Sequence, residues 1–202
     1  MKGNMTVILG IVIALALFLT PAHAKQNAIS FAGDVVITTP DSTVKAKLYV
    51  KNPYVRRLEM SREAGGMVFI TPENARGRVW MLDPSKKQYR ILSWPEVHKD
   101  PISAWTDIQY DMAGSRVGNE TIKGHPCTVY EYKYRGKDAV ALKLWLAEDI
   151  HFAIKRKADA KIAVEKNKAP QTIRGTLQVL NIEKGELDDA LFKIPTEYKE
   201  IK

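Results

Sequence analysis

Apolar and polar residues alternate along much of the chain after residue 33, as they do in half-buried β-strands. Between Val44 and Val50, for example, every second residue is apolar, and the residues between them are two lysines and a tyrosine. Turn residues separate such segments roughly every 8–12 residues, which is typical of an antiparallel sandwich or barrel and not of a parallel α/β fold. The alternation predicts strands over residues 34–38, 44–50, 55–61, 67–71, 78–82, 88–93, 128–134, 139–147, 152–157 and 172–183.

One segment departs from this alternation. Residues 101–112 place apolar side chains, Trp105 and Ile108 among them, at helical spacing. An Asp-Pro pair at residues 100–101 favours a helix start, and Gly114 favours its end. The sequence therefore predicts one amphipathic helix of about three turns, which either plugs one side of the sheet or forms a lid over an apolar cavity.

Several of the predicted strands are apolar on both faces. Residues 67–70 and 79–82 are continuous apolar runs, and residues 140–146 place leucines on one face and Trp145 on the other. An antiparallel sheet with one face in water does not need this pattern, so something must cover the second face. One short helix covers only part of it, which favours a ligand cavity. The predicted lining and lid residues are Phe69, Trp80, Trp105, Ile108 and Leu144.

Residues 1–24 have the three parts of a secretory signal peptide. Lys2 gives the positive start, residues 7–19 are apolar and uncharged, and Ala22-His23-Ala24 fits a cleavage site. A membrane anchor is the less favoured alternative, because a helix of this length rises only about 20 Å against the roughly 30 Å of membrane hydrocarbon. We expect export to the periplasm with cleavage after Ala24, and a single domain over residues 25–202.

Composition narrows the class of protein. The 202 residues are 45% hydrophobic and 27% charged, which is ordinary for a globular domain. A single cysteine rules out an intramolecular disulfide and a zinc site built from several thiolates. The formal net charge is +8. For an exported protein, this charge favours anionic lipid head groups or an acidic partner over nucleic acid, and peripheral contact with a membrane is one of the expectations. A solvated sheet face is the commonest explanation of such charge.

The sequence contains few candidates for catalysis. Its four histidines are not at metal-hydrolase spacing, and it has no nucleophile elbow, dinucleotide-binding or P-loop motif. Cys127 is predicted to be a small buried side chain and not a reactive thiol. Asp188 and Asp189 are predicted to be solvated or to cap the turn that follows them. We therefore expect a binding protein with no enzymatic activity, catalytic residue, metal or cofactor; a secreted hydrolase is the least favoured class.

Several stretches together resemble a known family. Residues 45–60 (KAKLYVKNPYVRRLEM) contain a Pro-x-x-x-Arg step, and residues 78–92 (RVWMLDPSKKQYRIL) contain a Trp-x-Leu-Asp-Pro hairpin. Residues 118–127, 145–149 and 191–195 extend the match. In order and spacing these stretches resemble the LolA/LolB-like superfamily of periplasmic lipoprotein carriers, most closely its uncharacterised secreted members.

The resemblance implies a mainly β fold, namely a curved, incomplete antiparallel β-barrel (half-barrel) with a covering amphipathic helix. It also implies a lid latch at Arg57, four residues after Pro53, with Glu59 as its partner on the same strand face. The alternative is that Arg57 is an exposed arginine of an edge strand. One departure from the family is that too few residues precede the first strand for the N-terminal helix of the sorting carriers.

Two functions follow from the resemblance. The first is an exported soluble protein that holds an acyl chain, lipid, lipoprotein or other apolar ligand in the half-barrel, in outer-membrane lipoprotein or lipid trafficking. The alternative is an envelope sensing or interaction module whose concave face binds a protein partner. Because a fold does not determine a function, the sequence leaves both open.

Overall fold

The computed structural model describes residues 29–52, 55–72, 78–93, 96, 114–134, 140–162 and 171–201. The chain forms strands β1 (Phe31–Thr38), β2 (Thr43–Asn52), β3 (Val55–Met60), β4 (Val68–Thr71), β5 (Arg78–Asp83), β6 (Gln88–Ser93), β7 (Ser115–Ile122), β8 (His125–Tyr134), β9 (Val140–Ala147), β10 (Phe152–Ile162), β11 (Gln171–Lys184) and β12 (Lys199–Glu200). Two short 3₁₀ helices, η1 (Arg62–Ala64) and η2 (Asp189–Phe192), lie outside the strands.

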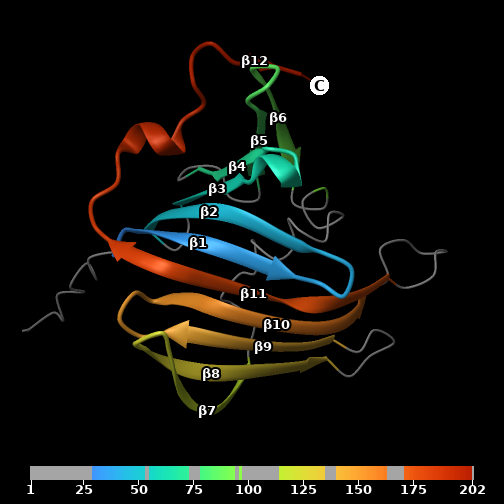
Figure 1. The fold of residues 1–202 in the computed structure, drawn as a ribbon, viewed down its shortest axis with the longest axis vertical. Helices are drawn as coiled ribbons and strands as arrows, with labels where there is room; N and C mark the ends of the chain where they lie inside the picture. The colour runs from blue at the N-terminus through green and yellow to red at the C-terminus, as the bar shows by residue number, and fades with distance from the viewer. Residues whose placement is uncertain are drawn as a thin grey trace, which may run out of the picture.

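The strands form one open, curved sheet in the order β12-β6-β5-β4-β3-β2-β1-β11-β10-β9-β8-β7 (Figure 1). Neighbouring strands pair antiparallel except β12 and β6, which run parallel. The predicted mainly β, open antiparallel sheet is thus confirmed. The covering helix predicted for residues 101–112 and the leader at residues 1–24 lie outside the described residues.

Strand pairing defines one face of the sheet, which we call the inner face. On it, one row of neighbouring side chains crosses β1, β11, β10, β9 and β8: Ile37, Leu177, Arg156, Leu144 and Tyr130. A second row crosses β1 to β5: Gly33, Leu48, Leu58, Phe69 and Met81. Because Gly33 and Ile37 are an even number of residues apart on β1, both rows lie on the same face.

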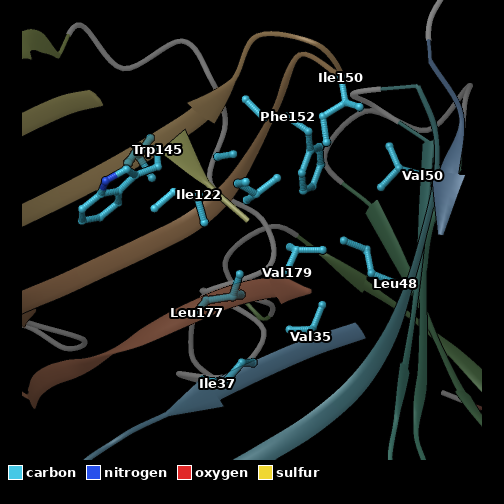
Figure 2. Packing of buried hydrophobic residues seen from close by; sticks show 14 of the residues in the cluster. Val35, Ile37, Leu48, Val50, Ile122, Trp145, Ile150, Phe152, Leu177 and Val179 are labelled. Atoms are coloured by element: carbon cyan, nitrogen blue, oxygen red, sulfur yellow. The ribbon is translucent and has the colours of Figure 1, made fainter. Parts of the chain in front are cut away.

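The core of the protein lies on the inner face, within the curve of the sheet. Figure 2 shows Val35, Leu48 and Val179 pointing toward one interior from β1, β2 and β11. Phe31 is fully buried, and its ring packs edge-on against the ring of Phe152 with 5.2 Å between centroids. This contact joins β1 to β10, two strands that are separated by β11 in the sheet.

The opposite, outer face of β4 to β6 is also apolar. Val68, Ile70 and Leu82 are buried there, and Trp80, Tyr89 and Tyr198 pack against them. Tyr198 belongs to residues 185–201, which we call the C-terminal segment and which runs from the end of β11 through η2 to β12 (Figure 1). On these strands the chain itself covers the second apolar face. The prediction that strands apolar on both faces indicate a ligand cavity is therefore wrong for β4 to β6.

Candidate functional site

The inner face is the candidate binding surface, and it contains two of the predicted lining residues. Leu144 is buried, with Tyr130 and Arg156 as its neighbours on β8 and β10. Phe69 is partly buried and packs against the cluster that contains Leu144. The structure thus brings β4 and β9, distant in the sheet order, to one apolar interior. Trp105 and Ile108 lie outside the described residues.

Trp80 is not part of this surface. It pairs with Ile70 and Ile91 and lies on the outer face, where it packs against the same buried cluster as Tyr198. Met81, the next residue, takes the inner-face position beside Phe69. The prediction that Trp80 and Phe69 share one interior is therefore corrected. A run that is apolar at every position carries no period, so its sequence does not say which residue faces which side.

Two arginines lie among the apolar side chains of the inner face, and the sequence analysis did not assign them there. Arg156 is only 2% exposed and is the largest of the fully buried side chains. Its guanidinium carbon lies 5.9 Å from the ring centroid of Phe152. Arg56 is 9% exposed and pairs with Val50 on β2. Arg156 and Ala158 are two residues apart on β10, so their side chains share one face of the strand. This alternation is the sequence signal that could have placed Arg156 on the inner face.

Arg57, the predicted latch residue, lies on the outer face and holds the C-terminal segment. Its Nε donates to the Glu59 carboxylate at 2.6 Å, and a second guanidinium nitrogen donates to the Leu191 carbonyl at 2.9 Å. Glu59 is thus its partner, as expected, and β3 is an internal strand of the sheet and not an edge. In the described structure Arg57 holds η2 in place. That it also latches a lid stays a prediction.

A second ion pair fastens the same short helix. Lys51 Nζ donates to Asp189 at 2.5 Å, and this hydrogen bond lowers the pKa of Asp189. The side chain of Asp188 accepts a hydrogen bond from the Ala190 backbone amide, so the predicted capping role of Asp188 is confirmed. Phe192 is buried at the end of η2.

His125, Asp149 and Lys184 form a polar cluster where β8, the β9–β10 turn and β11 meet. Asp149 Oδ2 lies 2.9 Å from His125 Nδ1 and accepts a hydrogen bond from Lys184 Nζ at 2.5 Å. Cys127 nearby is buried, as predicted, and this burial raises the pKa of its thiol. Among the residues described, no group of His, Cys, Asp and Glu is arranged to hold a metal ion.

The Asp149 cluster predicts a pH-dependent contribution to stability. Burial acts to raise the pKa of Asp149, but the hydrogen bonds from Lys184 and His125 outweigh it, and the net shift is below the ordinary value of 3.8. The stabilisation is therefore present above the unfolded-state pKa and is lost as pH falls through the lower folded-state pKa. We expect Asp149→Asn to lower the thermal unfolding temperature at pH 7, and the difference from the parent protein to shrink as pH falls through the lowered folded-state pKa of Asp149.

The measurement is a series of thermal unfolding curves for both proteins between neutral and acidic pH. Comparing the two proteins at each pH removes the effect of titrating groups that do not contact Asp149. A difference in unfolding temperature that stays constant over the whole range would contradict the assignment.

None of the described helices is long and apolar enough to span a lipid bilayer. A family model described as "Domain of unknown function (DUF4412)" matches residues 31–169. No curated protein matches the chain in sequence.

Solved structures share the fold. An uncharacterized conserved protein from Thermus thermophilus is similar with a TM-score of 0.52 and 15% identity, over 86% of this chain and 90% of that one. The complex of Pseudomonas aeruginosa MucA/MucB contains a chain similar with a TM-score of 0.51 and 18% identity, over 85% of this chain and 57% of that one. A LolA superfamily protein from Nitrosomonas europaea has a TM-score of 0.43 and 13% identity, over 82% and 90%. Identities this low concern the fold alone. A LolA superfamily protein is thus among the structures that this chain resembles, as the sequence leads us to expect.

Proposed function

This chain belongs to the family described as Domain of unknown function (DUF4412), and we propose that it is an exported protein that binds an acyl chain or a similar apolar ligand against its inner face. The observation that carries the proposal is the continuous apolar interior formed by strands from both halves of the sheet. Leu48, Leu144 and Leu177, from β2, β9 and β11, are among its aliphatic side chains. Aliphatic surface of this kind suits a hydrocarbon chain, which needs no directional partner.

The cellular part of the proposal rests on the leader at residues 1–24, which predicts export to the periplasm. There, a soluble carrier of acyl chains would serve lipid or lipoprotein trafficking to the outer membrane. The proposed role is binding without catalysis, so it needs no cofactor and no metal.

A second candidate function is the binding of a protein partner. It is favoured by the fold shared with a chain of the MucA/MucB complex, in which two proteins are associated. In this alternative the inner face holds an amphipathic segment of the partner in place of a lipid. The two candidates differ in whether a small apolar molecule binds the isolated protein.

Phe69 and Trp80 offer a matched test of the proposed binding face. They are aromatic residues on the paired strands β4 and β5, one on the inner face and the other on the outer. We expect Phe69→Ala to weaken binding of a fluorescent fatty acid about tenfold, because a large part of an apolar contact is removed. Trp80→Ala should leave binding within about twofold of the parent protein. Fluorescence titration measures both affinities.

The thermal stability of each variant is the control, since Trp80→Ala also removes packing against the buried cluster of Val68, Ile70 and Leu82. Equal weakening by both substitutions would contradict the inner face as the binding surface. A parent protein that takes up no fatty acid would move the assignment to the protein-partner candidate.

A further inference from the structure

Three lysines lie together on the outer face of β9 and β10. Lys143 and Lys157 are directly opposite each other on the two strands, and Lys155 follows on the same face. The ammonium groups of Lys155 and Lys143 lie 4.4 and 5.2 Å from the ring centroid of Trp145. We call Lys143, Lys155 and Lys157 the outer lysine cluster.

Lys143 and Lys157 repel each other across the two strands. Like charges directly opposite each other on neighbouring strands are destabilising. Glu131 offsets part of the repulsion, but its carboxylate lies 3.7 Å from Lys143 Nζ. No carboxylate of the described residues forms an ion pair with Lys155 or Lys157. An external anion would relieve the repulsion that the fold leaves in place.

The surroundings of the outer lysine cluster are polar, and the carboxylates beside it have partners of their own: Glu131 lies beside Lys143, Glu120 accepts from the Trp145 indole, and Asp159 pairs with Arg174. On β11, Thr176 and Gln178 are the neighbours of Lys157 and Lys155. Trp145 is only 5% exposed, and its Nε1 donates to Glu120 at 2.5 Å. The indole therefore supports the lysines from below and offers no exposed apolar anchor.

The position of the cluster in the sheet does not favour a protein partner. β9, β10 and β11 are internal strands with neighbours on both sides, so they offer no free edge for a partner strand. A protein interface would in addition need a well-packed aromatic or apolar anchor at its centre. Asp159 and Arg174, the next pair along β10 and β11, form their own ion pair at 3.2 Å. What the surface offers is positive charge on a broad polar sheet face.

From these observations we propose that the outer lysine cluster binds the surface of membranes that contain anionic phospholipids. The lipid phosphates would lie near the ammonium groups, and attraction to a negatively charged surface needs no apolar anchor. The proposed membrane contact agrees with the net charge of +8. Many basic residues of the sequence lie between Lys51 and Arg90, but the proposed contact is on β9 and β10. It does not depend on what the inner face binds.

The test is co-sedimentation of the mature protein with vesicles made of equal parts phosphatidylglycerol and phosphatidylcholine. Each lysine near an anionic surface strengthens binding about fivefold, so the double variant Lys155→Gln/Lys157→Gln should bind about twenty-five-fold more weakly. The control is Lys193→Gln/Lys199→Gln, which removes the same charge from two exposed positions in the C-terminal segment. We expect the control to bind like the parent protein.

Pure phosphatidylcholine vesicles should leave the protein in the supernatant, and high salt should release it from the anionic vesicles. Thermal unfolding checks that both double variants are folded. Equal weakening by the two double variants, or equal binding to both kinds of vesicle, would overturn the proposal. So would binding of the cluster to an acidic peptide such as polyglutamate without binding to vesicles.

Discussion

Replacing Phe31 by alanine is expected to lower the free energy of unfolding by about 3–5 kcal/mol. Phe31 is 0% exposed, and its edge-on contact with Phe152 connects β1 to β10 across β11. The substitution removes buried apolar area, leaves a cavity and breaks the aromatic pair. A domain of this size has a total stability of about 5–15 kcal/mol, so the loss is a large fraction of it.

Urea unfolding followed by tryptophan fluorescence gives the free energy for this comparison. Ile91→Ala is a suitable control, because Ile91 is apolar but 38% exposed on the outer face of β6. We expect that control to lose less than about 1 kcal/mol. A loss below about 1.5 kcal/mol for Phe31→Ala would mean that the two halves of the sheet do not depend on this contact.

Arg57→Leu is expected to release the C-terminal segment and to cost about 2–3 kcal/mol. The guanidinium donates to Glu59 and to the Leu191 carbonyl, and only 16% of its side chain is exposed. Leucine leaves both acceptors without this donor, and a hydrogen bond to a charged group is worth about 1.5–3 kcal/mol. The segment beyond η2 should then separate more easily from β6.

Amide hydrogen exchange measures that release directly. The amide of Lys199 donates to the carbonyl of Lys87, just before β6, and the amide of Ile201 donates to the carbonyl of Tyr89 in β6. Both amides should exchange at least about tenfold faster in Arg57→Leu. Lys51→Gln is the control, because its ion pair with Asp189 holds the same helix but is more exposed. Unchanged exchange in Arg57→Leu, or an equal effect in the control, would contradict the role given to Arg57.

Much of the sheet was predictable from local patterns. The alternation between Val44 and Val50 matches the buried face of β2, and the predicted strands on either side of residues 135–138 pair as β8 and β9, with Tyr134 opposite Val140. The capping role of Asp188 was also predictable, because the side chain and the amide it binds are two residues apart.

Other features depend on contacts that a local pattern does not contain. β7 was missed because all its residues before Ile122 are exposed, so no buried face appears in its sequence. Trp80 was assigned to the wrong face because its run is apolar at every position. The Arg57 contact with Leu191 joins residues 134 positions apart, and no spacing rule predicts such a pair.

The most direct test of ligand binding at the inner face is native mass spectrometry of the protein, purified without detergent. We expect an additional mass in the range of a fatty acid, lipid or lipoprotein acyl group, which is released on denaturation and reduced in Phe69→Ala but retained in Trp80→Ala. A parent protein that carries no such mass, and that takes none up when incubated with fatty acid, would contradict the proposal that the inner face holds an acyl chain.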